Sequence, residues 1–156
     1  MKKPLTTLLA IIVSLCIIIT FAFTAIQMVV FDQNRFEKAY EEYDRYEFIG
    51  ITPEDLHDVT SEMIKYLKGE REDLIMHKMI DGEMQQVFEE REILHMVDVQ
   101  KLFLGGMMIR NVSVIVGVFA LAILIMLARK ETLNVLSKTY LWVFLAFVVL
   151  AGSLAS

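Results

Sequence analysis

Residues 5–31 read LTTLLAIIVSLCIIITFAFTAIQMVVF, an uncharged and mostly apolar run close to the start of the chain. An α-helix rises about 1.5 Å per residue, so this run is long enough to cross the hydrocarbon core of a bilayer, which is about 30 Å thick. It exceeds the roughly 7–15 residues of a signal-peptide core, and no small-x-small cleavage site follows it. We therefore expect residues 5–31 to be a retained signal anchor and the first transmembrane helix.

Two more apolar segments, residues 107–128 and 139–156, follow later in the chain. Basic residues lie between these two segments and before the first helix: Lys2, Lys3, Arg129, Lys130 and Lys138. Because Lys and Arg concentrate on the cytoplasmic side of a membrane, we expect the N-terminus and the loop 129–138 to be cytoplasmic. The pattern predicts a multi-pass membrane protein with three transmembrane helices, and it puts residues 32–106 outside the cytoplasm.

The predicted external domain is strongly acidic. Residues 32–101 hold 19 of the 20 acidic residues and nine of the 15 basic ones, which gives this stretch a formal charge of −10. Phosphate groups would be repelled by such a surface, so nucleic acid is not expected as a partner. The chain's single cysteine, Cys16, lies in the first apolar run, so no disulfide is expected to staple the domain.

Local signals predict a small, mostly helical domain. Thr52-Pro53-Glu54-Asp55 is a strong helix start, with Thr52 as N-cap and two acids near the positive helix end. Gly69 is placed to end this helix, which we expect over about 53–68. Its apolar residues form one stripe: Leu56, Val59, Met63, Ile64 and Leu67.

A short β-hairpin and a long helix are expected next. Asp81-Gly82 matches a two-residue hairpin turn between arms that contain apolar residues. From about Gln86 a new helix is predicted to run through Gly105-Gly106 into residues 107–128. There, Ser113 and Gly117 form a small-xxx-small pair that lets another helix approach closely. The expected fold class is a membrane all-α protein with a small extracytoplasmic domain that contains this hairpin.

The segment between the anchor and the first external helix is aromatic and charged. Residues 36–48 read FEKAYEEYDRYEF, with Phe36, Tyr40 and Tyr43 at helical spacing. Aromatic rings with polar tips are typical of the membrane interface. We expect an amphipathic linker that lies at the lipid surface.

One helix face combines acid/base groups. Arg91, His95 and Asp98 stand at i, i+4 and i+7, and Glu92 lies beside them. Carboxylates three residues before and after a histidine can each accept its ring N–H, which fixes the tautomer and raises the basicity. This is the orienting half of an acid/base catalyst, although the same spacing also suits a salt-bridged surface histidine. His57 and His77 have the character of ordinary surface residues.

Other catalytic signatures are missing from the sequence. It has no H-E-x-x-H, no cysteine pair, no G-x-S-x-G and no P-loop. The expectation is a site without metal or cofactor, which would use acid/base side chains and the membrane setting.

The layout of the chain resembles a bacterial family. An anchor helix precedes YLKGERED (66–73) and DGEMQQVFEEREILHMVDVQKLF (81–103), and further spans follow. In this order the chain resembles an integral membrane protein family, found mainly in Gram-positives, that includes the lipoprotein intramolecular transacylases. The specific part of the match is Tyr66-Leu67-x-Gly69 together with Glu92-x-x-His95-Met96-x-Asp98-Val99.

The resemblance implies an enzyme and its substrate. The enzyme would move the sn-2 acyl chain of a diacylglyceryl-cysteine lipoprotein to the lipoprotein's own N-terminal amine, which leaves a lyso-form lipoprotein. The implied partners are membrane lipid and bacterial lipoproteins with a lipid-modified N-terminus. His95 would be the catalytic base, Asp98 and Glu92 its orienting carboxylates, and Arg91 and Arg110 the substrate-binding residues that stabilise charge.

Two expectations qualify this interpretation. Members of the family have a fourth span and a second important histidine beyond the third span, so a chain that ends at Ser156 is expected to be a truncated or short relative. The competing hypothesis is a non-enzymatic membrane protein whose external domain binds or senses a partner.

Overall fold

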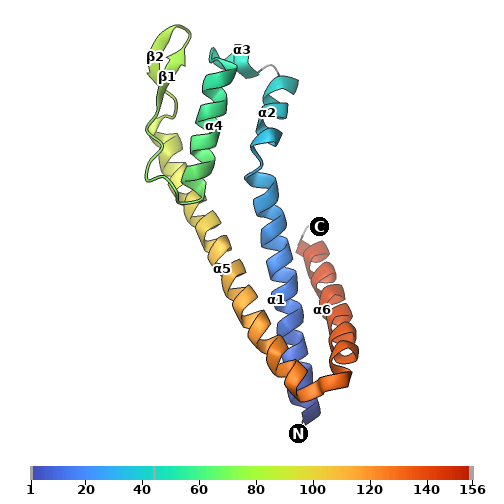
Figure 1. The fold of residues 1–156 in the computed structure, drawn as a ribbon. Coiled ribbons are helices and arrows are strands. Elements are labelled where there is room, and N and C mark those ends of the chain that lie inside the picture. The colour runs from blue at the N-terminus through green and yellow to red at the C-terminus, as the bar shows by residue number, and fades with distance from the viewer. Residues whose placement is uncertain (1, 44, 155–156) are drawn as a thin grey trace. The chain divides into compact units, whose positions relative to one another are not determined.

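The computed structural model describes residues 2–43 and 45–154, and these are mostly helical (Figure 1). The elements along the chain are α1 (Lys2–Val30), α2 (Gln33–Glu42), α3 (Arg45–Ile49), α4 (Pro53–Leu67), β1 (His77–Ile80), β2 (Glu83–Gln86), α5 (Glu90–Ala128), the 3-10 helix η1 (Arg129–Glu131) and α6 (Thr132–Leu154). They form two compact units. The first comprises the described residues before 26 and after 107, and the second comprises residues 26–107.

Two stretches are long and apolar enough to cross a membrane. One is Lys3–Val30, and the other is the 61-residue stretch Glu90–Leu150, in which α5, η1 and α6 follow one another directly. Their length and composition are those of membrane-spanning segments. The last two residues of the predicted third span, 155 and 156, lie outside the described residues.

The helices α1 and α5 pack closely in the first unit. Ala10 of α1 and Leu124 of α5 are fully buried in its apolar core. A side chain at Gly117 would bring a Cβ to 3.0 Å from the Cβ of Cys16, which is tighter than almost all contacts of this kind. The predicted close approach of another helix at Ser113 and Gly117 is therefore confirmed, and that helix is α1.

The turn between α5 and α6 is short. Arg129 has a φ of 48°, and its carbonyl accepts a hydrogen bond from the Thr132 hydroxyl at 2.8 Å. The expected loop 129–138 is helical from Thr132 onward, because Val135 and Leu136 of α6 pack against the core of the first unit.

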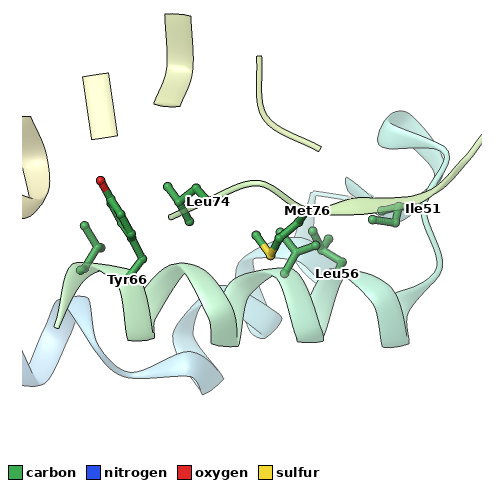
Figure 2. Close-up of a cluster of buried hydrophobic side chains, with 7 residues drawn as sticks. Ile51, Leu56, Tyr66, Leu74 and Met76 are labelled. Carbon is green, nitrogen blue, oxygen red and sulfur yellow. The ribbon is translucent and has the colours of Figure 1, made fainter. Parts of the chain in front are cut away.

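The second unit is built around α4. The Thr52 hydroxyl accepts a hydrogen bond from the Asp55 N–H at 3.2 Å, and Gly69 follows the helix with a φ of 76°. The predicted N-cap, helix and stop are thus confirmed. Figure 2 shows the segment after the helix running back along it, so that its apolar side chains meet those of α4. The buried core consists of Ile51, Leu56, Val59, Tyr66, Leu67, Leu74 and Met76.

The predicted hairpin is present. β1 and β2 pair antiparallel, and Asp81 and Gly82 have φ values of 52° and 83°, as a type I′ turn requires. Gln86 pairs with His77, so it ends a strand rather than beginning a helix. The expectation that the next helix starts near Gln86 is therefore wrong, and α5 begins at Glu90.

The aromatic segment folds as α2 and α3. Tyr40 packs against the core of the second unit, and its ring lies 6.2 Å from that of Tyr46 and 6.4 Å from that of Phe36. The Tyr40 hydroxyl also forms a hydrogen bond with Thr60 Oγ1 at 3.2 Å. Tyr40 is thus a packing residue of the domain, because α4 offers both an apolar surface and a hydrogen-bond partner.

Candidate functional site

His95 lies near the start of α5 and is exposed. It borders a surface hollow of about 380 Å³ that is lined by Phe88, Arg91, Glu92, His95 and Met96, called here the His95 hollow. In the part of the chain that the structure describes, the imidazole forms no hydrogen bond or ion pair. The exposed imidazole can therefore bind a molecule that enters the hollow without first losing a partner.

The two carboxylates expected to orient His95 have other partners. The Asp98 carboxylate accepts a hydrogen bond from Lys101 Nζ at 3.2 Å, and both side chains are largely exposed. Glu92 Oε2 accepts a hydrogen bond from the Glu89 backbone N–H at 2.9 Å. Glu92 therefore closes the first turn of α5 by satisfying an N–H group that the helix leaves without a partner.

The two arginines belong to different units. Arg91 is exposed and lines the His95 hollow in the second unit. Arg110 belongs to the first unit, where its guanidinium donates hydrogen bonds to Asn111 Oδ1 at 2.9 and 3.1 Å. The structure brings Arg91, Glu92 and His95 together, and it leaves Arg110 as a separate feature.

Sequence reasoning missed the surroundings of His57. Its Nδ1 lies 2.6 Å from Glu37 Oε1 and 3.1 Å from Gln33 Nε2. Gln33 and Glu37 are four residues apart on α2, so their helical spacing was a signal that one face of α2 could bind a partner. His57 thus links α2 to α4, although more than half of its side chain is exposed.

A basic side chain anchors the hairpin on α4. Lys78 Nζ lies 2.7 Å from Asp58 Oδ2 and 3.1 Å from Asp55 Oδ1. Hydrogen bonds from Lys78 and then from Thr52 lower the pKa of Asp55, while those to Asp58 and Asp55 raise the pKa of Lys78. These charges position the hairpin and lie outside the His95 hollow.

The arrangement of charged side chains offers no metal centre within the described residues. No group of three or more His, Cys, Asp or Glu side chains there could hold a metal ion. The chemistry available in the His95 hollow is that of an accessible imidazole beside a guanidinium and a carboxylate.

The chain was compared with models of known protein families. The family model described as lipoprotein intramolecular transacylase Lit matches residues 11–156. The chain belongs to the lipoprotein intramolecular transacylase family. No curated protein and no solved structure matches the chain. Membership of the transacylase family supports a function in acyl transfer on lipoproteins in general, and the apolar helices agree with a membrane protein.

Part of the sequence pattern that resembles the transacylase family has a structural role. Tyr66 and Leu67 are buried in the core of the second unit. The Tyr66 carbonyl accepts a hydrogen bond from Gln100 Nε2 at 2.6 Å, which ties the end of α4 to α5. A Cβ at Gly69 would lie 3.1 Å from a methyl group of Leu104, in addition to being strained by the positive φ. The pattern Tyr66-Leu67-x-Gly69 therefore fixes the packing of α4 on α5.

Proposed function

We propose that this chain is a membrane acyltransferase that moves the sn-2 acyl chain of a diacylglyceryl-cysteine lipoprotein to the lipoprotein's own N-terminal amine. The product is a lyso-form lipoprotein with an N-acyl cysteine. Membership of the transacylase family supports the reaction class. The observation that carries the proposal is the exposed His95, which has no partner within the described residues and lies at the edge of a hollow of about 380 Å³.

The proposed chemistry is an aminolysis. The α-amine of the lipidated cysteine attacks the sn-2 ester carbonyl, so a C–N bond forms and the C–O bond to glycerol breaks. An α-amine has a pKa of about 7.7–8.0, so much of it is protonated at neutral pH and must lose a proton before or during attack. Once that proton has gone to solvent, His95 Nδ1 or Nε2 takes the second proton, which the amine loses as the C–N bond forms, and returns it to the departing glycerol oxygen, which leaves as a hydroxyl.

Because ester and amine belong to one molecule, their proximity supplies a large part of the rate. The task left to the protein is to hold the two groups beside one base. The His95 hollow is formed by one short stretch of chain, Phe88 to Met96, so the backbone of α5 fixes the spacing of Arg91, Glu92 and His95.

Asp98 and Glu92 are proposed to orient the imidazole in the substrate complex. The pair between Asp98 and Lys101 is exposed, and an exposed pair of this kind contributes only about 0–1 kcal/mol. Asp98 can therefore exchange Lys101 for the imidazole three residues away at small cost. Hydrogen bonds of a catalytic site are often long without substrate and tighten in the complex.

Arg91 and Arg110 are proposed to stabilise negative charge on the substrate. Arg91 lines the hollow and is the better placed to meet the oxyanion that develops at the ester carbonyl. Arg110 belongs to the apolar part of α5, where a guanidinium suits a phosphate or carbonyl group at the lipid surface.

We also propose the membrane layout. α1, the apolar part of α5 and α6 would be three spans, with the N-terminus and the Arg129–Glu131 turn in the cytoplasm and residues 32–106 outside. The turn at η1 supports two spans in the second apolar stretch, because 61 residues far exceed the roughly 20 that one span needs. The substrate, a lipid-anchored protein of a Gram-positive bacterium, would then meet the domain outside the cytoplasm.

The test is mass spectrometry of a lipoprotein's N-terminal peptide. The full chain is expressed in a Gram-positive host whose lipoproteins keep a free amine and two ester-linked acyl chains. Wild-type protein is expected to convert them to the N-acyl lyso form, and His95→Gln is expected to lower conversion at least 100-fold, in line with the loss of a general base. His57→Gln is the matched control, because His57 lies outside the hollow, and it is expected to retain conversion.

The outcomes separate the candidate functions. Loss of conversion in His95→Gln alone, at equal protein abundance in the membrane, supports the proposal. Equal conversion by the two variants overturns the role of His95. No conversion by the wild-type chain overturns the proposed reaction and favours a non-enzymatic protein with a partner-binding external domain.

A further inference from the structure

A second cavity adjoins the His95 hollow inside the second unit. It has a volume of about 210 Å³ and lies between α2, α4, the hairpin and the start of α5. We call it the Tyr40 pocket. Its walls include Tyr40, Val59, Thr60, Met63, Ile80 and Val87. Phe88 and Glu92 line both the Tyr40 pocket and the His95 hollow, so the two spaces are neighbours.

The Tyr40 pocket is built for hydrocarbon. The Tyr40 hydroxyl and Thr60 Oγ1 form a hydrogen bond with each other, and Thr60 Oγ1 also donates one to the Leu56 carbonyl at 2.8 Å. These polar groups therefore need no partner from a ligand. An apolar cavity of about 150 Å³ remains dry and binds benzene, so a pocket of 210 Å³ has room for a hydrocarbon segment of more than six carbons.

We propose that the Tyr40 pocket binds the distal end of the acyl chain that is transferred, while the ester of that chain lies in the His95 hollow. The inference rests on the proposed function, because it is the ester at His95 that brings an acyl chain to the shared edge of the two spaces. The chain would pass from one space to the other beside Phe88, which lines both. The pocket then acts as a ruler that selects acyl chains by length.

Val87 and Met63 allow the volume of the pocket to be changed in both directions. Both are only partly buried, and the Val87 N–H donates its hydrogen bond to the Met76 carbonyl through the backbone, so a new side chain leaves that bond in place. Val87→Phe adds atoms to the pocket, and Met63→Ala removes them. Ile75→Phe is the matched control, because Ile75 is exposed in the same unit and is not part of the wall.

The acyl-chain profile of the product is the main measurement. Purified full-length protein in detergent receives synthetic diacylglyceryl-cysteine lipopeptides with sn-2 chains of graded length, and kcat/KM is measured for each. Burial of one methylene is worth about 0.8 kcal/mol, which is roughly four-fold in kcat/KM. Val87→Phe is expected to lower kcat/KM for long chains by about four-fold per excluded methylene and to leave short chains unaffected. Met63→Ala is expected to shift the optimum to longer chains.

Photolabelling gives an answer that does not depend on turnover. A fatty acid with a diazirine at its distal end is irradiated with the protein, and labelled peptides are identified by mass spectrometry. Label in residues 56–63 and 87–92 that disappears in Val87→Phe and persists in Ile75→Phe supports the pocket.

The failures of the two proposals are distinguishable. If the wild type transfers acyl chains and neither pocket variant changes the length profile, the Tyr40 pocket is overturned and the transacylase function stands. If the wild type transfers none, the function is overturned, and the position of the label still decides whether the pocket binds an acyl chain. Label confined to membrane-spanning residues overturns the pocket in either case.

Discussion

At the scale of single residues, Glu62 and Arg71 belong to a cluster of charged side chains in the second unit. Glu62 Oε1 accepts a hydrogen bond from Lys65 Nζ at 2.7 Å, and Oε2 accepts one from Arg71 Nη1 at 2.6 Å. Arg71 also donates from Nε to the Asp73 carbonyl at 2.7 Å. The guanidinium therefore holds the turn from which the chain runs to the buried Leu74.

This contact predicts a loss of stability in acid. Hydrogen bonds from Lys65 and then from Arg71 lower the pKa of Glu62 below its usual value. A lowered folded-state pKa gives stability that is present above the unfolded pKa of about 4.3 and is lost as pH falls through the folded one. Glu62→Gln is expected to cost roughly 1 kcal/mol at pH 7, and the difference from wild type should shrink below about pH 4.

Thermal unfolding of the detergent-solubilised protein between pH 3 and pH 7 measures this effect. Glu72→Gln is the control, since the Glu72 side chain is exposed. A pH-independent difference between Glu62→Gln and wild type would show that the carboxylate's charge does not matter.

The hydrogen-bond partner of Asp98 could not be predicted from the sequence. Helical spacing puts Asp98 within reach of His95, and it puts Lys101 equally within reach of Asp98. Helical spacing therefore allows Asp98 to pair with either His95 or Lys101. In the structure its partner is the Lys101 ammonium. The capping role of Glu92 was not predicted, because the helix was expected to start near Gln86 and Glu92 would then have stood beyond its first turn.

At the scale of elements, local signals that act within a few residues predicted the structure well. Thr52 and Pro53 gave the start of α4, and Asp81-Gly82 gave the hairpin turn. The start of α5 was missed because Gln86 is drawn into a strand by its pairing with His77, and pairing between strands is not visible in helical periodicity. The packing of the partly buried Tyr40 was missed for the same kind of reason, since it depends on contact with α4.

Gly50 lies where the corner between α3 and α4 meets the hairpin, a contact that was not predicted from the sequence. Its φ is 71°, its carbonyl accepts a hydrogen bond from the Asp81 N–H at 3.0 Å, and a Cβ there would lie 2.1 Å from Asp81 Oδ1. The corner between α3 and α4 thus lies against the tip of the hairpin. Only a residue without a side chain satisfies both the positive φ and this contact.

Gly50→Ala is expected to destabilise the protein by about 2–3 kcal/mol, because backbone strain adds to displacement of the Asp81 carboxylate. Gly82→Ala provides the matched comparison. Gly82 also has a positive φ, but a Cβ there meets nothing within 4 Å, so only the strain of about 1 kcal/mol is expected.

Thermal unfolding of the two variants and of the double variant Gly50→Ala/Asp81→Gly separates the cost of backbone strain from the cost of the clash with Asp81. The double variant should recover the part due to the clash, since glycine tolerates the φ of 52° at position 81. Equal losses in Gly50→Ala and Gly82→Ala would contradict a contribution from Asp81.

At the scale of the whole molecule, the proposed topology can be tested by labelling. The only cysteine, Cys16, is buried in α1, so Cys16→Ser gives a background without thiols. Single cysteines are then placed at the exposed positions Glu72 and Lys130, and intact cells are treated with a membrane-impermeant maleimide. Glu72→Cys is expected to react at once, and Lys130→Cys only after the membrane is permeabilised. The opposite pattern would invert the topology.

The division of the chain into two units was predicted from composition rather than from any motif. The separation of 19 acids from the apolar runs pointed to an acidic domain joined to apolar helices, and the two compact units divide the chain in a similar way, at residues 25/26 and 107/108. How many times the chain crosses the bilayer is harder to infer, because α5, η1 and α6 form one nearly continuous helical stretch. The short turn at Arg129 depends on packing in the first unit, which no local pattern encodes.

The hydrogen bond between Glu92 and the Glu89 N–H links the His95 hollow to the stability of the first turn of α5. Glu92 cannot turn toward His95 or a bound amine without releasing that N–H to water. Recruitment of Glu92 and fraying of the first turn of α5 are therefore thermodynamically linked, and each must favour the other. The hydrogen-exchange rate of this one amide would then serve as a gauge of whether the neighbouring hollow is engaged.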